Sequence, residues 1–164
     1  EMTHGFDDQR RQYDVEGNLK DWWTPEDAAQ FNDLADLVVG QYDKIIMIDS
    51  MAINGKMTLG ENIADFGGVS ISGTAFRKTK QGQTPDSLID GFTPMQRFYL
   101  SYAQVWRMNI RDQELRRRLK VDVHSPAKAR VNAVVANIPE FYETFNIDVS
   151  EEMYIPEEER VKIW

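Results

Sequence analysis

Apolar residues along this chain recur mostly every three or four positions, which is the spacing of α-helices that bury one face. The clearest example begins at Thr24 and Pro25, which suit the N-cap and the first position of a helix. The apolar residues that follow at helical spacing are Ala28, Phe31, Leu34, Ala35 and Val38. The pattern predicts a helix over residues 25–43, followed by a short extended segment at residues 45–48.

A second helix is predicted over residues 59–79. Thr58 stands three positions before Glu61, which is the spacing of a capping box. The apolar residues of this helix are Ile63, Phe66, Ile71 and Ala75, and they are interrupted by Gly67, Gly68 and Gly73. Because a glycine inside a helix costs up to about 1 kcal/mol relative to alanine, we expect another backbone to approach this helix closely.

The second half of the chain is also predicted to be helical. Thr93-Pro94 opens a helix whose buried face carries Phe98, Tyr102, Val105 and Trp106. Residues 112–120 form a short charged helix, another begins at Ser125-Pro126, and a last one covers residues 139–145. We therefore predict one mainly α domain over residues 1–164 with little sheet.

Composition narrows the possible functions. The 164 residues carry 19 Lys and Arg against 27 Asp and Glu, a formal charge of −8, which argues against nonspecific nucleic-acid binding. No apolar run is long enough for a membrane-spanning helix. The 8 Phe, 6 Tyr and 4 Trp residues are too many for a disordered tail. Because the chain has no Cys, a disulfide scaffold, a zinc ribbon and a Cys nucleophile are excluded together.

Imidazole chemistry could come only from His4 and His124, the two histidines of the chain. Glu61 and Asp65 are four residues apart on the second predicted helix and so share one face. We consider His4 and Glu61 as metal ligands, with Asp7 and Asp65 orienting ligands through hydrogen bonds. A catalytic zinc requires three protein ligands and one open position, so this chain offers one ligand too few.

The same residues also fit plainer interpretations. The Glu-x-x-His spacing of Glu1 and His4 is a weak signal, and an acidic pair on a helix is commonly a solvated face. His124 could be a surface histidine in a turn, and Trp106 could serve only in core packing. A di-iron bundle would need a second Glu-x-x-His, but Val121 stands three residues before His124. Spacing alone leaves a metal site undecided.

Five ordered sequence blocks resemble the neprilysin family of zinc metallopeptidases. The first is EMTHGFDD at residues 1–8, which is similar to the family's H-E-x-x-H-G-F-D-D without its first His. The others are DWWT at 21–24, NG at 54–55 with LGENIAD at 59–65, AQVW at 103–106, and DVHSP at 122–126 with Arg130 six residues after His124. The C-terminal Trp164 also fits, so the resemblance extends over the whole chain.

The resemblance implies a thermolysin-like zincin catalytic domain that binds one zinc ion and hydrolyses peptides. By motif, His4 and Glu61 correspond to zinc ligands, and Glu1 to the general base that activates water. Asp7 would hold His4, and Asp65 would hold another ligand His, the one missing from the first motif.

The resemblance also implies the substrate contacts. His124 would donate to the oxyanion of the tetrahedral intermediate, and Arg130 would bind a substrate backbone carbonyl. Val105 and Trp106 would line the pocket for the residue after the scissile bond, which favours an apolar side chain there.

The departures from the family pattern concern what precedes Glu1. The first zinc His, the substrate-binding strand and the helical cap of family members are not in this sequence. We therefore expect the chain to be the C-terminal catalytic part of a longer peptidase, paired with its missing N-terminal part and inactive alone. The lack of Cys favours a bacterial relative, and the resemblance favours an extracytoplasmic (periplasmic or secreted) location. The alternative is a helical interaction module that keeps the scaffold without the chemistry.

Overall fold

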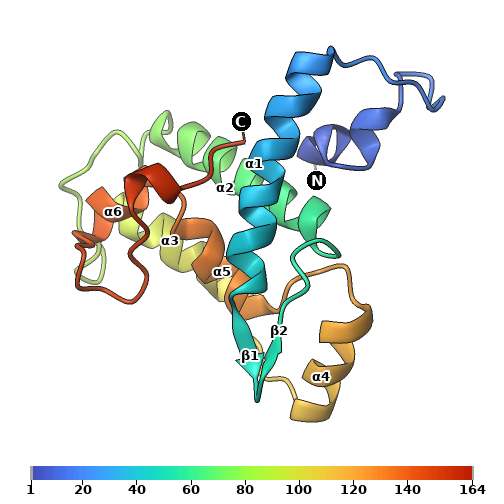
Figure 1. Cartoon of the computed structure of the whole chain (residues 1–164). Helices are drawn as coiled ribbons and strands as arrows, with labels where there is room; N and C mark the ends of the chain where they lie inside the picture. The colour runs from blue at the N-terminus through green and yellow to red at the C-terminus, as the bar shows by residue number, and fades with distance from the viewer. Residues whose placement is uncertain (1, 164) are drawn as a thin grey trace.

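The computed structural model describes residues 2–163 of the chain. Two residues of the family motifs lie outside this range: Glu1, which is predicted to be the general base, and Trp164. The helices predicted from the sequence are present, and the sheet is limited to one two-stranded hairpin, which confirms the mainly α fold (Figure 1). None of the helices in residues 2–163 combines the length and apolar character that a membrane crossing requires.

Two long helices form the centre of the domain. Helix α1 (Pro25–Asp43) begins at Thr24, whose hydroxyl accepts a hydrogen bond from the backbone N–H of Asp27. It packs on α2 (Leu59–Arg77), which also contacts the N-terminal segment.

Helix α2 packs against α1, α3, α5 and the N-terminal segment. The fully buried side chains between these elements are Val38, Tyr42, Leu59, Ile63 and Val134. The core is therefore centred on α2, the helix that carries Glu61.

Three shorter helices complete one side of the domain. Helix α3 (Pro94–Val105) begins with a capping box between Thr93 and Gln96, and it packs on α6 (Pro139–Phe145). The rings of Tyr99 and Phe141 meet edge to face with centroids 5.4 Å apart. Helix α5 (Ala127–Val135) packs on α2. This packing places the start of α5, and with it Arg130, beside the Glu61 helix.

A small lobe projects from the end of α1 (Figure 1). It consists of the hairpin of β1 (Ile46–Ile48) and β2 (Met51–Ala52), together with α4 (Asp112–Val121). The predicted extended segment at 45–48 is thus a strand, but its partner was not predicted. Arg116 of α4 binds Asp49 of the hairpin turn, with Nη2 and Oδ2 2.9 Å apart.

Short 3₁₀ segments occur at both ends of the described chain: η1 (Met2–Phe6), η2 (Arg10–Gln12) and η3 (Glu157–Glu159). Segment η1 packs against α2, where a Cβ on Gly67 would lie 2.6 Å from Cγ2 of Thr3. The close approach expected at the helix glycines therefore involves a side chain rather than a backbone. Gly68 has nothing within 4 Å of its Cβ position.

The predicted capping box at Thr58 is wrong. The Thr58 side chain makes no capping hydrogen bond, and its hydroxyl donates to the Asn54 carbonyl at 3.1 Å. The same hydroxyl accepts a hydrogen bond from the Asn62 side-chain amide at 2.9 Å. These competing partners occupy the hydroxyl that the cap would have used. Helix α2 also ends at Arg77 rather than at residue 79.

Candidate active site

His4 is held in a fixed orientation by Asp7. Its Nδ1 lies 2.9 Å from Asp7 Oδ2, and both residues are buried. The Asp7 carboxylate also accepts hydrogen bonds from the backbone N–H groups of Gln9 and Arg10. Burial acts to raise the pKa of Asp7, but these hydrogen bonds and the one to His4 outweigh it and lower the pKa. The contact expected between Asp7 and His4 is therefore present.

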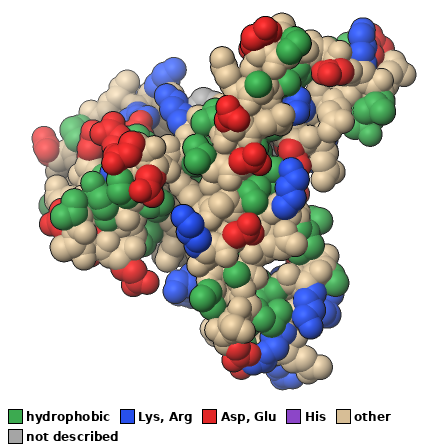
Figure 2. Space-filling model, viewed as in Figure 1, with side chains coloured by type: hydrophobic (Ala, Val, Ile, Leu, Met, Phe, Trp, Pro, Cys, Tyr) green, Lys and Arg blue, Asp and Glu red, His purple; other side chains and the backbone are tan. Residues whose placement is uncertain are grey.

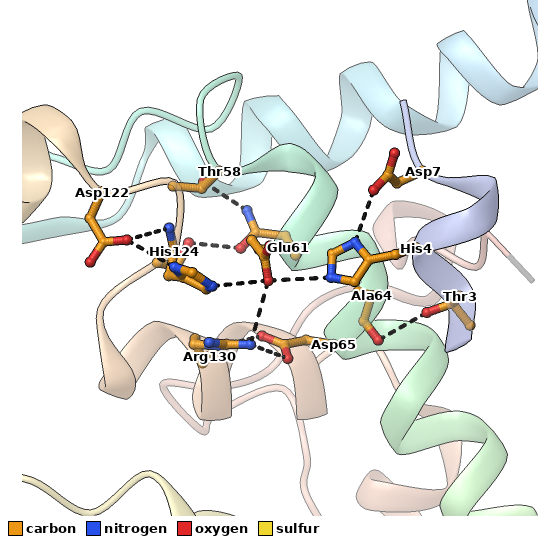
Figure 3. Close-up of polar contacts among 12 residues, drawn as sticks. Thr3, His4, Asp7, Thr58, Glu61, Ala64, Asp65, Asp122, His124 and Arg130 are labelled. Carbon is orange, nitrogen blue, oxygen red and sulfur yellow. Dashed lines mark hydrogen bonds and ion pairs between the residues drawn. The ribbon is translucent and has the colours of Figure 1, made fainter. Parts of the chain in front are cut away.

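Glu61 presents its carboxylate to His4 from the first turn of α2. Glu61 Oε2 lies 3.5 Å from Nε2 of His4, the ring nitrogen that Asp7 leaves free. Figure 3 shows this carboxylate between the imidazoles of His4 and His124. The two residues proposed as ligands, which are 57 positions apart in the sequence, thus face each other across the η1–α2 contact.

His124 approaches the same oxygen from the other side. Its Nε2 lies 3.3 Å from Glu61 Oε2, and its Nδ1 lies 2.9 Å from Asp122 Oδ1. Burial acts to raise the pKa of Asp122, but hydrogen bonds from the backbone and ring of His124 lower it overall. With Nδ1 turned to Asp122, Nε2 is the nitrogen that points into the site.

Arg130 is not an exposed helix charge. Its Nε and Nη2 donate to the two carboxylate oxygens of Asp65 at 2.7 and 2.8 Å. Its guanidinium also lies 3.9 Å from the ring centroid of Trp106, within the range of a cation–π contact. Burial raises the pKa of Asp65, and the bond to Arg130 opposes that rise. In the described residues Asp65 thus binds Arg130. The ligand histidine that Asp65 is predicted to hold is not in this sequence, so that role stays a prediction.

Two residues with no functional role predicted from the sequence, Asn62 and Ser125, connect α2 to the loop that carries His124. Asn62 is fully buried, and its side-chain oxygen accepts a hydrogen bond of 2.7 Å from the Ser125 hydroxyl. Its amide nitrogen donates to Thr58. Asn62 follows Glu61 and Ser125 follows His124, so this network sets the two functional side chains relative to each other. The only sequence signal was their position inside the two motifs.

The donor set fits part of a zinc site. Adjacent ligand atoms of a tetrahedral zinc are about 3.3 Å apart, close to the 3.5 Å between His4 Nε2 and Glu61 Oε2. The contact of Asp7 with the other nitrogen of His4 is also the usual support of a zinc-binding imidazole. Within residues 2–163 no three His, Asp or Glu side chains are grouped to hold a metal ion. The described chain therefore offers two ligands of a three-ligand site.

A cavity of about 480 Å³ adjoins His124 and Arg130. Val105, at the end of α3, and Trp106, directly after it, line the cavity together with apolar residues of the hairpin and α4. Val105 is 73% exposed, so its side chain is not part of the core. The structure thus places both residues predicted to line a substrate pocket on the wall of one cavity beside the site.

A histidine and a carboxylate that converge on one point, faced by a second histidine and an arginine, are an arrangement typical of metallohydrolases. The chain belongs to Peptidase family M13, whose model matches residues 1–161. It is 35% identical over 164 residues to the neutral endopeptidase of Lactococcus lactis strain IL1403, and 38% identical over 149 residues to neprilysin-2 of Drosophila melanogaster. These matches confirm the resemblance to the neprilysin family.

Solved structures agree with this family. The zinc metalloprotease ZMP1 of Mycobacterium tuberculosis, in complex with an inhibitor, superposes with a TM-score of 0.94 at 39% identity. The alignment covers 100% of this chain and 26% of that one. The chain likewise spans 24% of the Lactococcus relative and 19% of the Drosophila relative. It therefore corresponds to a minor part of the length of each.

Proposed function

We propose that this chain is the C-terminal catalytic part of a zinc-dependent endopeptidase. The observation that carries the proposal is the convergence of His4 Nε2 and Glu61 Oε2, 3.5 Å apart, with His124 on the opposite side of the same carboxylate. The names of the relatives, neutral endopeptidase and neprilysin, support peptide hydrolysis. The remaining zinc ligand would come from the N-terminal part of the intact peptidase, meaning the longer polypeptide that contains this chain.

Each residue has a distinct task in this proposal. His4 and Glu61 would hold zinc, which supplies Lewis-acid chemistry and lowers the pKa of water near the substrate. His124 donates from Nε2 to the oxygen that becomes negative when the substrate carbonyl is attacked. Arg130, oriented by Asp65 and Trp106, donates to a substrate backbone carbonyl. Preorganised donors of this kind contribute on the order of 100-fold or more to the rate.

The cavity beside His124 supports a preference for an apolar residue after the scissile bond. Val105 and Trp106 form its wall, and Arg130 lies against the Trp106 ring at the entrance to the site. A substrate carbonyl bound by Arg130 would therefore bring the neighbouring side chain to this wall.

The test is hydrolysis of a fluorogenic peptide by the intact peptidase and its variants. We expect His124→Ala to reduce kcat by about 100-fold or more, and a Lys120→Ala control, exposed at the end of α4, to retain activity. Absence of hydrolysis by the zinc-loaded wild type would refute the proposal and favour the interaction-module alternative. The 164-residue chain alone should bind zinc weakly and cleave nothing, since it provides two ligands.

A further inference from the structure

The lining of the cavity beside His124 carries more positive than negative side chains, although the chain as a whole is acidic. Its charged lining consists of Arg118, Lys128, Arg130 and one carboxylate, Asp122, whereas the whole chain has a net charge of −8. The apolar lining residues include Met47, Trp106, Met108, Ile110 and Leu115. The cavity therefore combines an apolar wall with positive charge.

The charges of the lining are not equally available to a ligand. Arg130 is bound by Asp65, and Asp122 is bound by His124. Arg118 donates from Nε to Glu114 at 2.9 Å. Its other guanidinium N–H groups take no part in this hydrogen bond and can donate to a ligand. Within residues 2–163 no carboxylate lies in ion-pair distance of the Lys128 ammonium. Arg118 and Lys128 thus supply the positive charge that a ligand would meet.

Figure 2 shows Lys and Arg side chains gathered over the α4 lobe, at the bottom of the view. Arg118 of this lobe lines the cavity, and positive charge of this kind favours an anionic partner. The apolar wall meanwhile binds an uncharged side chain.

From this arrangement we propose that Arg118 and Lys128 select substrates that carry a carboxylate next to the apolar residue bound at Trp106. The carboxylate could belong to an acidic side chain or to the C-terminus of the peptide. The inference rests on the proposed peptidase function and adds a specificity determinant to it.

Binding to the 164-residue chain tests the pocket without requiring hydrolysis. Four probes separate the sources of the carboxylate: acetyl-Leu-Glu-amide, acetyl-Leu-Gln-amide, acetyl-Leu-Ala with a free C-terminus, and acetyl-Leu-Ala-amide. Binding is followed by NMR shifts of the Trp106 indole. We expect one or both acidic probes to bind about threefold or more tightly than their neutral partners, with the difference reduced at high salt.

Variants assign the effect to the two residues. Arg118→Gln and Lys128→Gln should each remove most of the preference for the acidic probe. Arg117→Gln is the matched control, because Arg117 binds the same Glu114 but does not line the cavity. Equal binding of acidic and neutral probes, or an equal loss in the control, would overturn the inference.

Cleavage by the intact peptidase separates this inference from the proposed function. If the wild type cleaves peptides and Arg118→Gln leaves the ratio of kcat/KM for acidic and neutral substrates unchanged, the inference fails and the peptidase function stands. If the wild type cleaves nothing, the proposed function fails, and the probe binding alone decides whether the pocket recognises carboxylates.

Discussion

The buried amide of Asn62 offers the most specific test of how the site is held together. Asn62→Ala removes the hydrogen bonds to Thr58 and from Ser125, each worth about 1 kcal/mol. The Thr58 hydroxyl keeps the Asn54 carbonyl as a partner, but the structure gives the buried Ser125 hydroxyl no other acceptor in residues 2–163. That unsatisfied hydroxyl adds about 1 kcal/mol or more. We therefore expect a loss of about 3 kcal/mol in the free energy of unfolding.

Urea denaturation of the chain measures this loss. Asn32→Ala is the control, because Asn32 is exposed and accepts one hydrogen bond from Arg11, so its change should stay within about 0.5 kcal/mol. A double-mutant cycle with Ser125→Ala should give a coupling energy of about 1 kcal/mol. Additive effects of the two substitutions, or an Asn62 effect no larger than that of the control, would refute the network.

Two further predictions concern the N-terminal segment. Because the folded-state pKa of Asp7 is lowered, its ionised form stabilises the fold above the unfolded value of 3.8, and this contribution is lost as pH falls through the folded pKa. Asp7→Asn should cost about 1–2 kcal/mol at pH 7 and progressively less in acid; a pH-independent cost measured by urea denaturation would contradict this. Gly68→Ala should raise the melting temperature, whereas Gly67→Ala, which meets Thr3, should lower it; equal shifts would contradict the η1–α2 packing.

The helices were predictable because their signals are local. Thr24-Pro25 and Thr93-Pro94 cap and open helices that begin where the sequence indicated, and the 25–43 prediction matches α1. The capping box predicted at Thr58 is wrong because its hydroxyl bonds instead to the Asn54 carbonyl and the Asn62 amide. The β2 partner strand was missed because Met51-Ala52 is too short to show a period.

The composition of the site was predictable only through its motifs, and of its connections only the contact of Asp7 with His4 was predicted. Spacing alone left a metal site of His4 and Glu61 undecided, and it did not place His124 beside Glu61. The pairing of Asp65 with Arg130 joins residues 65 positions apart, and no periodicity indicates such a contact. The bond between Asn62 and Ser125 is equally distant in sequence, at 63 positions.

In the proposed site, His4 and Glu61 bind zinc, whereas His124 contacts the substrate. The zinc content of the purified intact peptidase tests this assignment most directly. His4→Ala and Glu61→Ala should each lose the metal, measured as moles of zinc per mole of protein after dialysis. His124→Ala should keep one zinc while losing activity, because His124 donates to the substrate rather than to the metal. Loss of zinc in His124→Ala, or its retention in His4→Ala, would contradict the account.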